Sequence, residues 1–370
     1  MLAAYVILIL ILIIILIKIY IKIRCPFWSI QPVFQIYNIA YWLSPPKIIQ
    51  KDMPPINKYY DFTIQFSDQL TQKKDFYQLM SKHYLRKKNV KYSPPKGGVF
   101  PYFEKHNKKC FFSLQYKFNT LIGAMTTRPL EAMLHGDKYS IYYVDFLCIH
   151  SKHRKQGNAP KIIYTHYVQS RKQTGNTIFL FKREDKVNKI VPLTTFSTYL
   201  FSLKYWKKIQ LEHTLLKNHR IVKDNIQLLY HYLETIKHLF PCFIMPCLSN
   251  LCHLVENQLL YVFLLMYRNK PFACYFFRNN YTSYEGKSSI EFTTSVCSDM
   301  SKESFFVQYF FDSLYKINPH NLIIENVAHN GIILKQILHK RTPVGRSMSA
   351  YFFYNFGYRP FLGKEVFLLN

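Results

Sequence analysis

A basic turn at residues 150–159 has the composition and spacing of a site for phosphate groups. It lies between an apolar run that ends at Ile149 and a helix that apolar spacing predicts at 159–171. Backbone N–H groups at a helix start point toward an anion, and the helix dipole favours negative charge there. The pattern R-x-x-G-x-A from Arg154 has the spacing of an acyl-CoA pyrophosphate loop; a solvated basic turn is the alternative. The residues expected to contact phosphate are Arg154, Lys155, Gln156, Gly157, Asn158 and Ala159.

The glycine and the basic residues of this turn have separate roles. Gly157 lets the main chain approach a ligand closely because no Cβ intrudes. Arg154 and Lys155 add charge-assisted hydrogen bonds to phosphate. The sequence contains neither a Walker loop (GxxxxGK[ST]) nor a Rossmann loop (GxGxxG). His150 and His153 are interpreted as phosphate partners, with acid–base groups as the alternative.

The eight cysteines fit a reducing compartment and do not predict a metal site. Their one cluster, C-x4-C-x4-CH at 242–253, has apolar residues between its cysteines instead of the turn residues typical of zinc sites. Cys148 lies in an apolar strand with no identifiable base nearby. We therefore interpret its side chain as part of the core and not as a nucleophile.

The elements that must position these residues alternate between strands and helices. β-branched and aromatic runs predict strands, whereas apolar residues at helical spacing predict helices. Strands are expected at 110–116, 120–127, 141–149, 258–267, 272–277, 321–326 and 350–354, and helices at 68–86, 159–171, 223–239, 304–317 and 331–339. This alternation indicates an α/β or α+β fold with mixed sheets, and the comparable order in the two halves indicates a duplicated fold.

Length and composition exclude several classes of protein. The chain has 370 residues, a formal net charge of +28, 49% hydrophobic residues and 17% aromatic residues. It is too apolar to be disordered, and its length suits one large domain or two ordinary ones. The charge indicates acidic partners such as phosphates or anionic lipid, or reflects only an AT-rich genome. No compact basic–aromatic module supports nucleic-acid binding, so we expect no nucleic-acid partner.

The N-terminal segment has the composition of a membrane anchor. Residues 1–17 carry no charged side chain, and a helix needs roughly 20 apolar residues to cross a bilayer. A cleaved signal peptide is the alternative, but the basic residues Lys18, Lys22 and Arg24 all lie on the C-terminal side. The positive-inside rule places that side in the cytosol. We therefore expect a transmembrane anchor at 1–24 in a single-pass membrane protein, with a soluble body that faces the cytosol.

Six segments match motifs of one enzyme family in the same order along the chain. YVDFLCIH at 143–150 resembles EINFLCVH, and the basic turn after it resembles the phosphate loop that follows that strand in the family. FWSIQPV at 27–33 is similar to FWxTQPVP, and LIGAMTTRP at 121–129 is similar to LVGFISAIP. YFFYNF at 351–356 and GKEVFLL at 363–369 resemble YYLYNW and GxEKVGLVL. The sequence thus resembles the protein N-myristoyltransferases (glycylpeptide N-tetradecanoyltransferases) over nearly all of its soluble body.

The resemblance implies two fused acetyltransferase-like (GNAT) halves after the anchor. The first, at 25–205, would bind acyl-CoA, and the second, at 206–370, would bind the peptide. The implied reaction transfers myristoyl from myristoyl-CoA to the N-terminal glycine amine of substrate proteins. No metal and no permanently bound cofactor is implied, and we expect a monomer.

The resemblance also assigns roles in the chemistry. Phe146 and Leu147 match the residues whose backbone N–H groups form the oxyanion hole, where negative charge develops on the thioester carbonyl. The α-carboxylate of Asn370 matches the C-terminal carboxylate that deprotonates the attacking amine in the family. The apolar run 366–369 is suited to draw that carboxylate inside, and a frayed chain end is the alternative.

Other positions match the acyl-CoA site of the family. Phe27 and Trp28 match its CoA-binding aromatic pair. Flat aromatic rings are suited to this role because adenine can stack on them. Anchoring at the membrane interface is the alternative for this pair. The remaining residues expected beside acyl-CoA are Leu147, Cys148 and Ile149, followed by the phosphate loop.

Two departures from the family concern the peptide. The family's FGxGDG is reduced to TPVGRS at 342–347, so Arg346 stands where the family has an acid that receives a basic peptide side chain. Of the family's YWHRSLNP only Ser202-Leu203 is recognisable. Two alternatives therefore stay open: a catalytically silent acyl-CoA- and peptide-binding protein, and a GNAT-type protein N-acetyltransferase.

Overall fold

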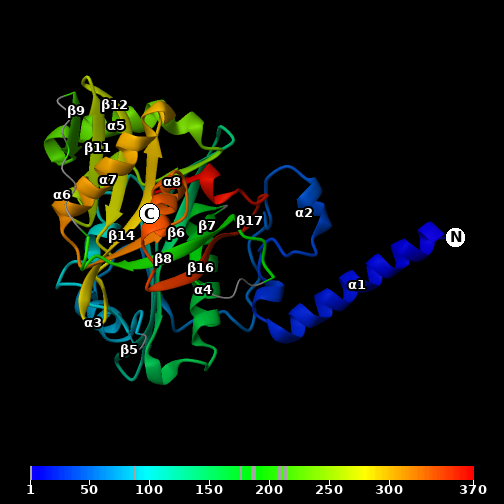
Figure 1. Ribbon diagram of the computed structural model, residues 1–370. Coiled ribbons are helices and arrows are strands. Elements are labelled where there is room, and N and C mark those ends of the chain that lie inside the picture. The colour runs from blue at the N-terminus through cyan, green and yellow to red at the C-terminus, as the bar shows by residue number, and fades with distance from the viewer. Residues whose placement is uncertain (1, 87–88, 176, 185–188, 207–210, 212–214) are drawn as a thin grey trace.

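The N-terminal helix extends away from the rest of the protein. The computed structural model describes residues 2–86, 89–175, 177–184, 189–206, 211 and 215–370. Helix α1 (Leu2–Arg24) contains neither glycine nor proline and projects from the body in Figure 1. Its segment Ala4–Arg24 is long and apolar enough to cross a membrane. The predicted apolar helix is present, and its insertion into a membrane stays a prediction.

The body is built on one mixed sheet, to which the described residues contribute 16 strands. The main path of the sheet runs β18-β10-β5-β6-β7-β16-β8-β15-β14-β12-β11-β9. The strands of this sheet are β2 (Gln65–Ser67), β3 (Val90–Tyr92), β4 (Phe111–Lys117), β5 (Thr120–Leu134), β6 (Asp137–Ile149), β7 (Ile178–Glu184), β8 (Thr194–Ser202), β9 (Leu216–Arg220), β10 (Cys242–Met245), β11 (Leu260–Tyr267), β12 (Lys270–Arg278), β13 (Thr282–Tyr284), β14 (Lys287–Cys297), β15 (Asn321–Glu325), β16 (Gly345–Tyr354) and β18 (Val366–Leu368). A separate pair joins β1 (Lys47–Ile48) to β17 (Phe356–Gly357).

Helices cover both faces of this sheet (Figure 1). They are α2 (Ile39–Leu43), α3 (Lys73–His83), α4 (Asn158–Thr174), α5 (Ile226–Ile236), α6 (Leu248–Glu256), α7 (Glu303–Ile317) and α8 (Asn330–Lys340). Successive side chains of a strand point to opposite faces. On β6, Phe146 and Cys148 pack with α3, whereas Leu147 and Ile149 pack with Ile162 of α4. Strand β6 is thus a central strand between two helices.

The predicted mixed α/β fold is confirmed, and every expected helix and strand has a counterpart. Strands β1, β2, β3, β7, β8, β9, β10, β13, β14 and β17 and helices α2 and α6 were not expected from the sequence. β14 illustrates why, because Thr293, Thr294 and Ser295 make it read as polar although all three are buried. The Ser295 hydroxyl donates to Asn330 Oδ1 at 2.7 Å, so the interior satisfies its polar group.

The two expected halves contribute strands to the same sheet. Strand β16 lies between β7 and β8, and β10 lies between β5 and β18. The final segment of the chain therefore completes the sheet next to strands of the first half. The expected boundary at 205/206 is not marked by a break in the sheet, and it stays a prediction.

Candidate active site

Strands β6 and β7 run side by side for only three residue pairs and then separate. Ile141–Tyr143 pairs in parallel with Ile178–Leu180. Beyond that point β7 stays paired with β16 and β6 stays paired with β5. One edge of each strand therefore loses its neighbour, and backbone groups along that edge become available to a ligand. Two cavities open beside this separation.

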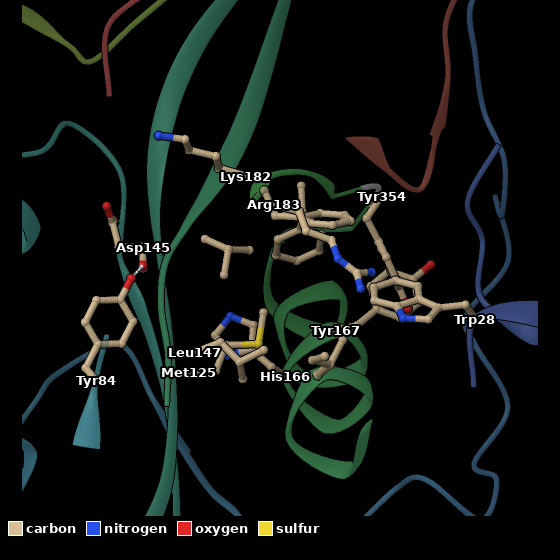
Figure 2. A pocket seen from close by; sticks show the side chains of 14 residues that line it. Trp28, Tyr84, Met125, Asp145, Leu147, His166, Tyr167, Lys182, Arg183 and Tyr354 are labelled. Carbon is tan, nitrogen blue, oxygen red and sulfur yellow. Dashed lines mark hydrogen bonds between the residues drawn. The ribbon is translucent and has the colours of Figure 1, made fainter. Parts of the chain in front are cut away.

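The smaller cavity is mostly apolar and has a volume of about 380 Å³. That size and lining are typical of ligand pockets. Figure 2 shows Met125, Leu147 and His166 in its centre and Trp28 with Tyr354 at one end. Its lining residues are Trp28, Tyr84, Met125, Val144, Asp145, Leu147, Ile163, His166, Tyr167, Phe179, Phe181, Lys182, Arg183 and Tyr354.

The aromatic pair predicted to bind CoA belongs to the body and not to the apolar helix. The ring of Trp28 stacks on Phe181 with centroids 5.7 Å apart, and its carbonyl accepts a hydrogen bond from Gln35 Nε2 at 2.7 Å. Phe27 is buried and packs edge-on against Tyr59. Trp28 therefore forms part of the cavity wall. Phe27 packs against the Trp28 ring, with centroids 5.1 Å apart.

His166 is a neutral, structural histidine inside the smaller cavity. It is fully buried, and its ring nitrogens hydrogen-bond the hydroxyls of Ser113 at 2.8 Å and Thr127 at 2.9 Å. Burial lowers the pKa of His166 to about 3. The imidazole is therefore uncharged near neutral pH and is not a base for the chemistry.

The predicted phosphate-binding residues lie together in an exposed turn at the N-terminus of α4. Gly157 caps the helix at φ +80°, a backbone conformation that favours glycine. Arg154 donates from Nε to the Ile149 carbonyl at 3.0 Å and from Nη2 to the His83 carbonyl. Asn158 closes the turn by donating to the His153 carbonyl at 2.9 Å. Arg154 and Asn158 thus shape the loop, and the first N–H groups of the helix remain available, as at any helix start.

The predicted oxyanion residues lie where the β5–β6 register shifts, beside the strand separation. The Phe146 N–H donates to Thr126 Oγ1 at 3.2 Å, and the Leu147 side chain lines the smaller cavity. Cys148 and Ile149 are buried on opposite faces of β6. Burial raises the pKa of the Cys148 thiol to about 12, which fits its interpretation as a core residue.

The larger cleft has a volume of about 610 Å³ and draws its walls from both halves of the chain. Tyrosines and charged residues dominate it, namely Tyr84, Tyr92, Tyr102, Tyr143, Tyr199, Tyr281, Tyr284, Asp145, Lys182, Arg183, Glu184, Arg278, Glu291 and Arg346. The segment 342–347, which departs from the family pattern, contributes Gly345, Arg346 and Ser347. Five residues line both cavities, namely Tyr84, Val144, Asp145, Lys182 and Arg183. The two cavities therefore meet at the separation of β6 and β7.

A buried group of charges, here called the charge cluster, lies beside this meeting point. It consists of Lys182, Arg278, Glu291, Glu325 and the main-chain oxygen of Asn370. The Lys182 ammonium bridges Glu325 and Glu291, with 3.3 Å to Glu291 Oε1. Arg278 contacts Glu291 Oε2 at 2.7 Å and donates to the C-terminal oxygen of Asn370 at 3.0 Å.

Asn370, the last residue of the sequence, is held inside the protein. Asn370 is 4% exposed, and the N–H of Leu369 donates to the Ile244 carbonyl at 2.9 Å. Strand β18 places Val366, Phe367 and Leu368 in the core beside β10. The apolar run thus brings the main chain of Asn370 next to Arg278, a residue of the larger cleft.

Comparison with solved structures identifies the fold. A crystal structure of Saccharomyces cerevisiae N-myristoyltransferase with bound myristoyl-CoA matches with a TM-score of 0.73 and 13% identity, over 92% of this chain and 94% of that chain. A second one, with myristoyl-CoA and inhibitors, matches with a TM-score of 0.72 and 14% identity, over 95% and 99%. The chain has the N-myristoyltransferase fold.

The sequence comparisons found no match, so the assignment of the fold depends on the structural match. Neither a protein-family model nor a curated protein sequence matches the chain. The resemblance expected from short motifs is nevertheless confirmed at the level of the fold, because the structural match covers more than 90% of the chain. At 13–14% identity, the roles of individual residues stay predictions.

Sequence reasoning missed the charge cluster apart from Asn370. Glu325 ends an otherwise apolar strand and Glu291 lies in a hydroxyl-rich one, so the isolation of these two carboxylates was the available signal. Lys182 gave no such signal, because Arg183 and Glu184 follow it directly. A charge that interrupts a buried strand must find a partner inside the fold. Among the described residues, no group of three or more His, Cys, Asp or Glu side chains is placed to hold a metal ion.

Proposed function

We propose that this protein transfers the acyl chain of myristoyl-CoA to the N-terminal glycine amine of substrate proteins. The observation that carries the proposal is the meeting of an apolar cavity and a charged cleft at the separation of β6 and β7. An acyl chain needs an apolar site, whereas a peptide amine needs a polar one. The reaction needs both sites to meet at one point, so that thioester and amine lie in contact.

In this proposal the smaller cavity receives the acyl chain, with Trp28 at one end of its wall. The turn at 154–159 binds the CoA phosphates through helix N–H groups, with Lys155 supplying charge. Leu147, Cys148 and Ile149 border the acyl-CoA with their backbone. The position of the turn directly after β6 supports this assignment, because one strand then leads from the acyl site to the phosphate site.

The backbone of β6 supplies the oxyanion hole in this proposal. Successive N–H groups of a strand point to opposite sides, and the Phe146 N–H is directed to Thr126 on β5. The Leu147 N–H is then directed to the open side, where the thioester carbonyl develops negative charge. Phe146 contributes when its 3.2 Å bond to Thr126 is exchanged for one to the oxyanion.

The C-terminal carboxylate orients the amine and accepts a proton from it as the C–N bond forms. Its burial and its place beside Arg278 support this role. An α-carboxyl has an unperturbed pKa of about 3.3–3.7, so it holds a proton only briefly. It passes that proton to the departing CoA thiolate, which leaves as the thiol. The products are the N-acylated peptide and CoA.

Transfer of labelled myristate tests the proposal. The protein is incubated with labelled myristoyl-CoA and a glycine-terminated peptide, and the peptide mass is measured. We expect a gain of one myristoyl group, none on an N-acetylated peptide, and slower transfer from acetyl-CoA. Binding of myristoyl-CoA without transfer would support the silent binding protein instead, and faster transfer from acetyl-CoA would support the acetyltransferase.

We also propose that α1 anchors the protein in a membrane with its body in the cytosol. Lys18, Lys22 and Arg24 follow the apolar run, and the positive-inside rule places them on the cytosolic side. Deletion of residues 1–24 should release the protein from membranes at high salt and leave acyl-CoA binding intact. Retention at high salt would contradict a purely helical anchor, whereas retention only at low salt would indicate binding to anionic lipid.

A further inference from the structure

Helix α2 exposes apolar side chains beside the apolar helix α1. Ile39 and Leu43, at neighbouring positions on one side of α2, are 51% and 82% exposed. Ile36, just before the helix, is 53% exposed. Single exposed apolar residues need no explanation, but a group of them marks a contact surface. These three side chains, together with Trp42, are here called the exposed face of α2.

The opposite side of α2 is fixed to the body. The rings of Tyr41 and Trp42 pack against the buried ring of Phe34, with centroids 5.6 and 4.9 Å apart. The indole N–H of Trp42 donates to the Ile36 carbonyl at 3.1 Å. Strand β1, which follows α2, pairs with β17. The exposed face therefore has a fixed position on the body.

The end of α1 packs against the segment that leads into α2. The Lys18 ammonium lies over the ring of Tyr37, 5.4 Å from its centroid. Lys189 lies over the ring of Tyr20 in α1, and its carbonyl accepts the N–H of Ile36 at 3.0 Å. Figure 1 shows α2 on the side of the body from which α1 projects. Helix α1 and the exposed face of α2 are thus neighbours.

These contacts set the level of α2 in the anchored protein. A lysine near the end of a transmembrane helix lies at the headgroup level, because its ammonium reaches out of the hydrocarbon. Lys18 is the first charged residue of α1, and Tyr37 contacts it. Tyr37 and the helix directly after it therefore lie near the headgroup level, where Tyr and Trp side chains are enriched.

The charges around the exposed face are complementary to anionic lipid. The first 60 residues contain a single acid, Asp52, and six basic residues, namely Lys18, Lys22, Arg24, Lys47, Lys51 and Lys58. Lys22 and Arg24 are exposed at the end of α1, and Lys47 is exposed beside α2, over the ring of Tyr41. A basic residue close to an anionic membrane surface contributes about 1 kcal/mol to binding.

We propose that the exposed face of α2 docks in the headgroup region of the membrane that α1 enters, with Lys47 on anionic lipid. The inference rests on the proposed anchoring by α1 and adds a second contact that orients the body. Trp28, at one end of the smaller cavity, follows Arg24 by four residues, which span at most about 14 Å. The docked body therefore holds that end of the cavity beside the membrane surface.

This orientation suits the proposed acyl transfer. A myristoyl chain binds to membranes with an association constant of about 10⁴ M⁻¹. The acyl-CoA donor and the acylated product therefore collect at the surface beside which Trp28 lies. Helix α1 alone would leave the body free to turn about the helix axis, whereas a second contact fixes the side that faces the membrane.

Quenching of Trp42 fluorescence by nitroxide lipids tests the inference in the full-length protein. Nanodiscs of phosphatidylcholine and phosphatidylserine carry the nitroxide either near the headgroup or at the end of the acyl chain. The difference between wild type and Trp42→Phe gives the emission of Trp42. We expect the nitroxide near the headgroup to quench this emission more strongly than the deep one. The emission of Trp206, obtained in the same way from Trp206→Phe, should be quenched by neither.

Charged variants show whether the exposed face itself makes the contact. Ile39→Asp with Leu43→Asp places carboxylates on that face and should abolish the quenching of Trp42. Leu228→Asp with Met300→Asp, at residues that are 49% and 51% exposed elsewhere, is the matched control and should retain it. Thermal unfolding shows whether each variant is folded, and Trp42→Tyr replaces Trp42→Phe if the latter is not. Quenching that persists in folded Ile39→Asp with Leu43→Asp would overturn the inference.

The inference and the anchor fail separately. Leu10→Trp supplies a reporter in the middle of the apolar run, which the deep nitroxide should quench more strongly. Quenching of this reporter without quenching of Trp42 would overturn the inference and leave the anchor standing, as expected if a second copy or another protein covers the exposed face. Quenching of neither would overturn both. These measurements do not use acyl transfer, so their outcome is independent of the proposed activity.

Discussion

The two cavities differ in origin and in chemistry. The smaller one is built almost entirely from the first half of the chain and keeps its single histidine neutral. The larger one needs both halves and is bordered by the charge cluster. An acyl chain gains from apolar burial, whereas an ammonium must be matched by charge. The fold satisfies these opposite needs by separating two strands, so that the sites meet at the backbone of β6.

An extension of the C-terminus should impair the charged cleft and leave the apolar cavity intact. Two added glycines after Asn370 replace the carboxylate with a peptide bond at a position that is 4% exposed. We expect transfer to fall by about 100-fold or more, since a positioned base contributes roughly 10²–10⁴-fold. Myristoyl-CoA affinity should stay within about twofold, as measured by titration.

Asn370→Gln is the matched control for this extension, because it keeps the main-chain carboxylate. It should retain most of the transfer rate. Full activity of the extended protein would remove the carboxylate from the mechanism.

Changes in the phosphate loop should weaken the binding of CoA and leave the binding of peptide unchanged. Arg154→Ala with Lys155→Ala should weaken CoA binding by about 2–4 kcal/mol, because Arg154 holds the shape of the loop and Lys155 supplies charge to phosphate. Peptide binding should not change, because no residue of the turn lines the larger cleft. Lys335→Ala with Lys340→Ala on α8 removes the same charge elsewhere and is the control. Unchanged CoA affinity in a folded double variant would refute the phosphate site.

The pH dependence of stability should distinguish the charged cleft from the neutral cavity. Because the folded pKa of Glu325 is raised to about 7, its contribution to stability is complete below about pH 4.3 and is lost as pH rises through 7. Glu325→Gln should therefore gain about 1–3 kcal/mol relative to wild type between pH 5 and pH 8. Thermal unfolding curves that run parallel for the two proteins across this range would contradict the assignment.

Thr126→Val should have the smallest effect on acyl transfer among these variants. It tests whether the Phe146 N–H needs the Thr126 hydroxyl for the chemistry. It removes the hydroxyl that accepts the Phe146 N–H. We expect a loss of stability of about 1–3 kcal/mol from the unpaired N–H, and transfer within about threefold of wild type. Thr126→Ser restores the acceptor. A tenfold loss of transfer in folded Thr126→Val would show that the hydroxyl itself is needed.

Much of the fold could be predicted because local pattern and tertiary environment agree. The run 141–149 is apolar on both faces, and it forms a central strand between α3 and α4. Gly157 and the helix behind it were predicted for the same reason, since turn and helix signals coincide. β14 was not predicted, because its buried hydroxyl residues read as polar and the partners of Thr293 and Ser295, Phe276 and Asn330, are distant in sequence.

Some residues of the candidate site could likewise be predicted from the sequence, whereas others could not. Residues that match short motifs, such as Trp28 and Leu147, could be proposed from the sequence, and both line the smaller cavity. Glu291, Glu325 and Lys182 lie on three different strands, and only the sheet order brings them together. No spacing rule within one segment could have found them.

Binding of acyl-CoA of two chain lengths tests the central claim most directly. Full-length protein in nanodiscs is titrated calorimetrically with myristoyl-CoA and acetyl-CoA, with empty nanodiscs as the blank. Each buried methylene contributes about 0.8 kcal/mol, so burial of even a third of the longer chain predicts at least about 100-fold tighter binding of myristoyl-CoA. Leu147→Trp, which narrows the smaller cavity, should weaken that preference. Equal affinity for the two ligands in the wild type would contradict the assignment of the smaller cavity to the acyl chain, and with it the account of the two meeting sites.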